Sequence, residues 1–151
     1  MFAVVGEALL DMVQGPGDTY LARPGGGPLN IAVGLRRLGH HTAMMTRLSS
    51  SPLGEILRRY AGDNELDLSA AVSAASPATL AFASLDSQGR ASYDFYVDGT
   101  ADWAWSTAEL ARLPRHAQVV HTGSLVATIE PARPVWCGPG GASCGRPVRC
   151  C

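Results

Sequence analysis

The stretch Pro24-Gly25-Gly26-Gly27-Pro28-Leu29-Asn30-Ile31-Ala32-Val33-Gly34 decides how this chain folds, and it leads into Leu35-Arg36-Arg37-Leu38-Gly39. The three glycines let the backbone approach a bound ligand closely, because no Cβ stands in the way. Pro28 suits the first turn of a helix, whose unpaired N–H groups favour oxygen-rich ligands. Asn30 offers a donor and an acceptor in that turn, which suits a sugar hydroxyl. A flexible linker would not run into such a helix, so we interpret the stretch as a binding loop.

The residues after the glycines predict an amphipathic helix. Ile31, Leu35 and Leu38 form its apolar face. Arg36 and Arg37 lie off that face near the C-terminal end, where positive charge is favourable, and Gly39 is a natural stop.

Short strands and helices alternate along the first half of the chain, which predicts an α/β fold with a parallel sheet. The expected strands are residues 2–5 and 42–48, and Ser51-Pro52 begins a second helix with its apolar stripe at Ile56, Leu57 and Tyr60. Residues 8–13 are expected to continue as extended chain that carries Asp11. Residues 19–22 would return as its partner strand after a turn.

The middle of the chain predicts a β-hairpin over residues 79–97, with a turn at Asp86-Ser87-Gln88-Gly89. In its second arm Tyr93, Phe95 and Val97 face one way, whereas Ser92, Asp94 and Tyr96 face the other. Such a two-faced ribbon does not belong inside a parallel sheet. We therefore expect it to form a small flap at the edge of the sheet.

Composition limits the classes of partner. The 151 residues carry a formal net charge of −1, with 46% hydrophobic and 17% charged residues, which is typical of a globular domain with a core. No basic patch is present, so nucleic acid is not an expected partner. No apolar run reaches membrane-spanning length and the N-terminus lacks a basic signal region, so we expect no membrane partner and a cytoplasmic location.

The cysteines and histidines do not predict a metal site. All four cysteines (Cys137, Cys144, Cys150, Cys151) lie in the last fifteen residues, without the Cys-x-x-Cys spacing of a zinc site. A disulfide framework would spread its cysteines through the fold. The histidines at 40, 41, 116 and 121 follow no ligand spacing and are expected at the surface or in the core.

From about Pro131 the periodic pattern stops. Residues 131–151 hold four Pro, four Gly, four Cys and three Arg, and neither helical nor strand periodicity is present in them. This composition is what an out-of-frame reading of a GC-rich gene gives. We therefore hypothesise that residues 1–130 are the folded part, that residues 131–151 are an irregular frameshifted tail, and that the native frame ends near Glu130.

Residues 1 to about 130 resemble the N-terminal half of the ribokinase-like (pfkB) carbohydrate kinases, in particular their fructokinase-type members. The matching segments are, in order, residues 4–11, 24–35, 47–54, 93–103 and 121–125. The glycine run alone would be weak evidence, but five motifs in order and at the right spacing are specific. Thr46, Ser50 and Ser51 depart from the glycine and acidic residues usual at these places in the third motif.

The resemblance implies a Rossmann-like α/β domain with a small β-lid over the sugar, and the hairpin of residues 79–97 would belong to that lid. It implies that Asp11 and Asn30 hydrogen bond to sugar hydroxyls and that Gly25 and Gly26 allow the sugar to approach the backbone. Residues around Tyr96 and 99–102 would contact the substrate from the lid side, and Ser124 would line the same pocket.

The resemblance also implies ATP and Mg²⁺ as cofactors of the full-length family. The family's second signature, a Gly-Ala-Gly-Asp segment that supplies an anion hole and a catalytic Asp, does not occur in this sequence. We therefore assign no catalytic residue and no metal ligand, and expect that this chain lacks the C-terminal half of the family fold and does not bind ATP or Mg²⁺ by itself.

These observations lead to one favoured function and two alternatives. The favoured function is that of a fructokinase-like carbohydrate kinase, which phosphorylates a sugar hydroxyl with ATP and is inactive as this truncated chain. The alternatives are a non-catalytic fragment that binds sugar or forms a homodimer through the lid, and an unstable remnant of a pseudogene. The sequence does not specify which sugar is bound.

Overall fold

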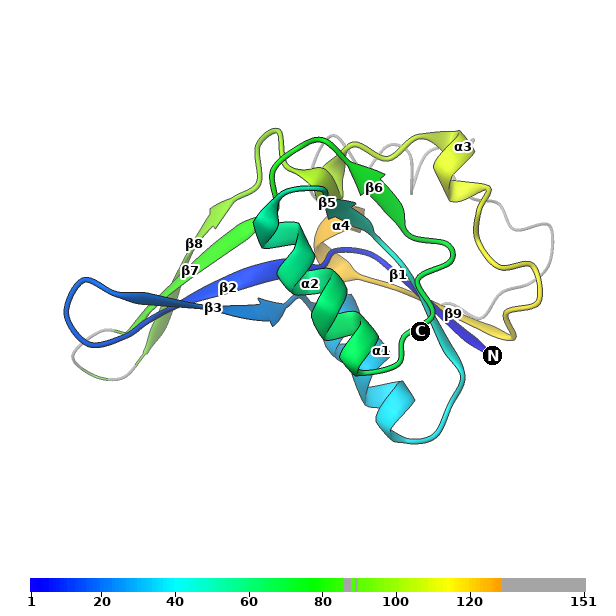
Figure 1. Cartoon of the computed structure of the whole chain (residues 1–151), viewed down its shortest axis with the longest axis horizontal. Helices are drawn as coiled ribbons and strands as arrows, with labels where there is room; N and C mark the ends of the chain where they lie inside the picture. The colour runs from blue at the N-terminus through cyan, green and yellow to red at the C-terminus, as the bar shows by residue number, and fades with distance from the viewer. Residues whose placement is uncertain (86–87, 89, 129–151) are drawn as a thin grey trace.

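A computed structural model describes residues 1–85, 88 and 90–128 (Figure 1). The tail from residue 131 and most of the predicted hairpin turn lie outside the described residues. The described residues form a three-stranded, a four-stranded and a two-stranded sheet. In Figure 1 the four-stranded sheet extends to the left, away from the helices and the other two sheets.

The three-stranded sheet is parallel and has the order β4-β1-β9. Strand β1 (Phe2–Val5) lies between β4 (Thr42–Met45) and β9 (Val119–Thr122). Val4 packs with the cluster under the helices, whereas Ala3 and Val5 join the cluster on the opposite face. Burial on both faces explains why this strand is a continuous apolar run, as is typical of parallel sheets.

Helices α1 (Gly27–Arg37) and α2 (Pro52–Asp63) cover one face. Helix α1 contacts β1 and β4. Its buried residues are Pro28, Leu29, Ala32 and Val33, while Ile31 and Leu38 are 39% and 76% exposed. The predicted apolar face of this helix was therefore wrong, because the buried stripe starts at Leu29 and follows the i, i+3, i+4 spacing from there.

The α/β fold is confirmed, with one strand divided. The run expected at 42–48 breaks at Thr46 into β4 and β5 (Arg47–Ser49), and β5 pairs in parallel with β6 (Val72–Ala74). Helix α2 follows directly, and its N-cap Ser51 accepts a hydrogen bond from the Gly54 N–H at 3.4 Å. Leu57 and Ala61 of this helix are buried.

The four-stranded sheet has the order β3-β2-β7-β8. Strands β2 (Leu9–Gln14) and β3 (Tyr20–Gly25) pair antiparallel, as do β7 (Leu80–Leu85) and β8 (Ala91–Tyr96). Strand β2 also pairs in parallel with β7. The hairpin is thus one half of a larger sheet, in which the strand that carries Asp11 is central.

Short helices complete the other face of the parallel sheet. They are the 3₁₀ helix η1 (Ala101–Trp103), α3 (Thr107–Leu110) and α4 (Ser124–Thr128). Trp103, Trp105, Leu110 and Val126 belong to the core cluster on this side, so both tryptophans pack in the core. Within the described residues, no helix is long and apolar enough to cross a membrane.

The packing of α2 on β5 gives a test of the fold. A Cβ at Gly54 would lie 1.9 Å from the Ser49 carbonyl oxygen, so Gly54→Ala should lower the free energy of unfolding by about 1–3 kcal/mol. Gly62 in the same helix has no atom within 4 Å of a Cβ position, and Gly62→Ala should raise that free energy by about 0.5–1 kcal/mol. Urea unfolding followed by circular dichroism measures both, and equal stability of the two variants would contradict this packing.

Candidate functional site

Polar residues gather where the chain passes between the four-stranded sheet and the rest of the molecule. The joining segments follow β1, follow β3, precede β7 and follow β8. In Figure 1 these segments lie between the four-stranded sheet at the left and the rest of the molecule. Of the four predicted binding residues, Gly25 ends β3, Gly26 joins it to α1 and Asn30 lies in the first turn of α1. Asp11 lies on the neighbouring strand β2.

Asp11 and Gly25 are in direct contact. Asp11 is half-buried on β2, and Gly25 is the last residue of the neighbouring strand β3. A Cβ at Gly25 would lie 2.1 Å from Asp11 Oδ2, so the carboxylate occupies the space that any side chain there would need. Burial raises the pKa of the Asp11 carboxyl above its ordinary value.

Gly26 and Asn30 belong to the start of α1. Gly26 is the N-cap, with φ of +103°, and a Cβ there would lie 2.9 Å from the Glu7 carbonyl oxygen, so both conformation and space require glycine. The Asn30 N–H donates to the Gly26 carbonyl at 3.0 Å, and the Asn30 residue is exposed. The N-cap provides no side chain to the first-turn N–H groups, which remain suited to an oxygen-rich ligand.

The strand register shows what shares a face with Asp11. Asp11 pairs with Arg23 on one side and with Ala81 on the other, and Ala81 pairs with Phe95. Tyr96, which the sequence led us to expect near the substrate, lies on the opposite face and stacks edge-on against Phe82 at 5.3 Å between ring centroids. Phe95, which is 48% exposed, is the aromatic residue of β8 in the Asp11 row.

Glu7 is a buried carboxyl that the sequence did not single out. It is 1% exposed, its Oε2 accepts a 3.4 Å hydrogen bond from the Val126 N–H, and its Oε1 has no hydrogen-bond partner among the described residues. Burial raises the pKa of Glu7. Hydrogen bonds from its own backbone N–H and from those of Val126 and Leu125, together with the charge of His121, act to lower it.

The space beside Glu7 is filled by the Pro28 ring. A Cβ at Gly123 would lie 1.9 Å from Pro28 Cγ and 3.0 Å from Glu7 Oε2, and a Cβ at Gly6 would lie 2.5 Å from the same Pro28 Cγ. The start of α1 is therefore packed tightly against the segments that follow β1 and β9. This packing fixes the position of the glycine run.

Asp102 is the second buried carboxyl, and it bonds to two of the joining segments. Its Oδ1 accepts a hydrogen bond from the Ala8 N–H at 3.0 Å, and its Oδ2 is hydrogen bonded to the Thr79 hydroxyl at 2.5 Å. Burial raises the pKa of Asp102 to about 7; the charge of Glu7 also raises it, while the Thr79 hydroxyl, the Ala8 N–H and Arg47 lower it. Asp102 is 1% exposed, so it braces the joining segments instead of contacting substrate as the sequence led us to expect.

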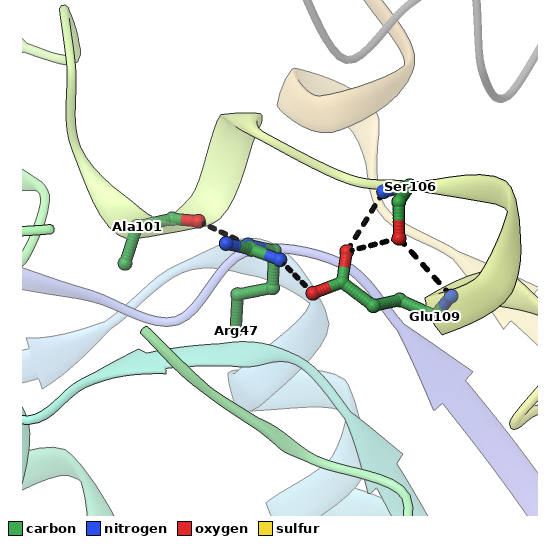
Figure 2. Close-up of polar contacts among 4 residues, drawn as sticks. All are labelled: Arg47, Ala101, Ser106 and Glu109. Atoms are coloured by element: carbon green, nitrogen blue, oxygen red, sulfur yellow. Dashed lines mark hydrogen bonds and ion pairs between the residues drawn. The ribbon is translucent and has the colours of Figure 1, made fainter. Parts of the chain in front are cut away.

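Figure 2 shows how the segment that carries Asp102 is held in place. The Arg47 Nε donates to the Ala101 carbonyl at 2.8 Å, and the Arg47 guanidinium forms an ion pair with Glu109. Glu109 also accepts hydrogen bonds from the backbone N–H and the hydroxyl of Ser106 at 2.7 and 2.9 Å. Although burial acts to raise it, these bonds from Ser106 and Arg47 hold the pKa of Glu109 below its ordinary value.

No group of three or more His, Cys, Asp or Glu side chains in the described part of the chain is arranged to hold a metal ion. The predicted Ser124 begins α4, directly after Gly123.

Asp102 lies in the segment 99–102 that the resemblance singled out, but its bracing role and its partner Thr79 were not predicted, although each residue has a local signal. Asp102 stands between Ala101 and Trp103, and a charged residue flanked by apolar ones is a candidate for burial. Thr79 immediately precedes the apolar run of β7. Neither signal reveals that the two side chains meet, since only the tertiary fold brings them together.

Comparisons with known proteins agree on one family. The profile described as pfkB family carbohydrate kinase matches residues 3–133. A fructokinase from Rhizobium leguminosarum bv. trifolii is 36% identical over 131 residues, which cover 83% of this chain and 39% of that protein. The chain thus spans about two fifths of the length of the curated relatives that it matches.

Solved structures show the same likeness. The fructokinase with bound ATP from Xylella fastidiosa has a TM-score of 0.72 at 28% identity, over 80% of this chain and 38% of that chain. An uncharacterised sugar kinase from Pyrococcus horikoshii has a TM-score of 0.77 at 25% identity, over 88% of this chain and 48% of that chain.

The brace around Asp102 can be tested through Arg47. Arg47→Met should lower the free energy of unfolding at pH 7 by about 1.5–3 kcal/mol, because Glu109 and the Ala101 carbonyl would lose a charged donor. The folded-state pKa of Glu109 lies below its ordinary value of 4.5. Its stabilising contribution is therefore present above that pH and is lost as the pH falls through the folded pKa.

The difference between wild type and Arg47→Met should accordingly shrink in urea titrations performed below about pH 4. Arg36→Met is the control, because Arg36 pairs with Glu65 at the surface, where the side chains are 30% and 74% exposed. It should cost at most about 1 kcal/mol. Equal losses in the two variants would contradict the role of Arg47.

Proposed function

Because this chain belongs to the pfkB family of carbohydrate kinases, we propose that it provides the sugar-binding side of an enzyme that transfers a phosphoryl group from ATP to a hydroxyl of a sugar such as fructose. The fructokinase names of its relatives support this sugar class. The contact between Asp11 and Gly25 beside the start of α1 is the observation that carries the proposal.

Asp11 is the proposed acceptor for two neighbouring sugar hydroxyls. An ionised carboxylate accepts two hydrogen bonds at once, and charge-assisted bonds of this kind are stronger than neutral ones. The contact with Gly25 holds the carboxylate at the end of β3, where the chain turns into α1.

Gly25, Gly26 and Asn30 are proposed to complete the sugar contacts. The Cβ positions of Gly25 and Gly26 are taken up by Asp11 and the Glu7 carbonyl, so these glycines are proposed to let the backbone at the sugar site pack closely around Asp11. Asn30 is exposed in that turn and can both donate to and accept from a hydroxyl. The four-stranded sheet, which includes the hairpin of residues 79–97, would act as the lid over this site.

ATP is the proposed phosphoryl donor, as the ATP-bound fructokinase among the similar structures suggests. Phosphoryl transfer depends on a base for the attacking hydroxyl and on donors that stabilise the transferred group. We assign none of the described residues to these roles or to Mg²⁺. We therefore propose that the isolated 151-residue chain binds sugar without phosphorylating it. We also propose that the protein is cytoplasmic.

Pairing of two chains through the four-stranded sheet is the second candidate function. Val13, Leu21, Tyr93 and Phe95, here called the apolar patch, lie in the rows at and beside Asp11 and are 41–53% exposed. Contiguous exposed apolar residues are typical of interaction surfaces. A homodimer through this patch is compatible with sugar binding in the same sheet.

Asp11→Ala tests the proposed sugar site. Loss of the charged acceptor should weaken fructose binding by about 1.5–3 kcal/mol, or about 10- to 150-fold. Isothermal titration calorimetry of the 151-residue chain with fructose measures this change.

Asp94→Ala is the matched control, because Asp94 is an exposed carboxylate on the opposite face of the same sheet. It should leave the affinity for fructose unchanged. Wild-type affinity in Asp11→Ala, or an equal loss in both variants, would contradict the assignment of Asp11. Sedimentation of wild type and Phe95→Ser tests the homodimer separately.

A further inference from the structure

Asp102 is linked to all the segments that join the four-stranded sheet to the rest of the molecule. It bonds directly to the segment after β1 through Ala8 and to the segment before β7 through Thr79. It reaches the segment after β8 through Thr79, because the Thr79 and Thr100 hydroxyls lie 2.7 Å apart. The segment after β3 rests on the first of these, since Gly26 packs against the backbone of Glu7.

Four oxygen atoms form a continuous chain at this junction. Asp102 Oδ2 is followed by Thr79 Oγ1, Thr100 Oγ1 and the carbonyl oxygen of Val97, at successive separations of 2.5, 2.7 and 2.7 Å. Each separation is the length of an O–H···O hydrogen bond. Three contacts of this length therefore require three protons.

The two threonine hydroxyls supply only two of these protons. A backbone carbonyl has no proton to donate, and an ionised carboxylate only accepts. If Asp102 were ionised, two oxygen atoms in this buried chain would face each other with no proton between them. If Asp102 carries a proton on Oδ2, it donates to Thr79, Thr79 donates to Thr100, and Thr100 donates to Val97.

We propose that Asp102 is a neutral carboxylic acid whose proton completes this hydrogen-bond chain, and that it acts as a positioning residue for the four-stranded sheet. Its Oδ1 remains free to accept from the Ala8 N–H, so protonation costs no other contact. The sheet that carries Asp11 is thus held by a proton that can be removed.

The charges around Asp102 favour this state. Burial raises the pKa of Asp102 to about 7, and the charge of Glu7, from the segment after β1, acts in the same direction. Arg47, from β5, is the opposing charge, and it is itself paired with Glu109. Thr79 and Thr100 are 0% and 7% exposed, so water has little access to repair a missing bond.

Loss of the Asp102 proton lowers the stability of the folded state as the pH rises. The folded-state pKa of about 7 lies above the ordinary value of 3.8. The contribution of the bound proton to stability is therefore complete below about pH 4 and is lost as the pH rises to about 7. Above that pH, one contact in the oxygen chain has no proton.

Carbon-13 NMR of the aspartate carboxyl groups tests the proposal on the complete 151-residue chain. The Asp102 carboxyl resonance, assigned through its own backbone, should titrate with a midpoint near pH 7, well above the ordinary aspartate value of 3.8. A midpoint near pH 4 in the wild type would overturn the proposal, whether or not any variant folds.

Thr100→Val separates the effect of the hydrogen-bond chain on the Asp102 pKa from the effect of burial. Without the Thr100 hydroxyl, the Thr79 proton is free to bond an ionised Asp102, so the midpoint should fall by about one pH unit. If burial alone raised the midpoint, the added methyl group would leave it unchanged or raise it further. Either of these results would overturn the proposal.

Thr46→Val is the matched control. The Thr46 hydroxyl is buried, has no hydrogen-bond partner among the described residues and lies outside the oxygen chain, so this variant should keep the wild-type midpoint. An equal fall in Thr46→Val and Thr100→Val would also count against the chain. These titrations use neither sugar nor nucleotide, so their failure leaves the proposed function standing, and a failure of fructose binding leaves Asp102 protonation standing.

Discussion

A buried backbone N–H has to find an acceptor, and at Ala8, where the chain leaves one sheet for another, that acceptor is the side chain of Asp102. The regular ladder of β1 ends just before this point, so strand pairing cannot provide the bond. Asp102 is positioned to accept this bond because the Arg47 Nε donates a hydrogen bond to the carbonyl of the neighbouring Ala101. The strand that carries Asp11 therefore starts from a fixed position, and the placement of the candidate sugar site depends on a residue outside that site.

Features that depend on local spacing were predictable from the sequence. The first strand, both long helices and the antiparallel hairpin each have a periodic pattern or a capping signal within a few residues. The apolar face of α1 was misplaced because its stripe was counted from Ile31, whereas the glycine loop already brings Leu29 into the core. Both antiparallel pairs of the four-stranded sheet were predicted, but their union was not, since the parallel pairing of β2 with β7 joins distant segments and leaves no local signal.

The candidate site likewise contains residues that were predictable from a local motif and residues whose contacts depend on the tertiary fold. Asp11, Gly25, Gly26 and Asn30 were predicted from a motif and its resemblance to a family, and the contact of Asp11 with Gly25 gives that motif a physical reason. The sequence placed Asp102 in the expected substrate-contacting segment 99–102 and gave Thr79 no role, and neither residue indicates the other as its partner. Their bond becomes visible only when the fold excludes water from both. The protonation state of Asp102 depends on Thr79, Thr100 and Val97 together, so it cannot be predicted from any one of these residues.

The Pro28 ring lies between the backbones at Gly6 and Gly123, and this has a consequence for how related sequences can diverge. A side chain at either glycine would occupy the space of the ring. A substitution at one of these positions is therefore tolerable only after the proline has been replaced, and a larger residue at 28 needs both glycines. The three positions lie far apart in the chain but share one packing contact. They are therefore expected to change together during evolution or to stay unchanged.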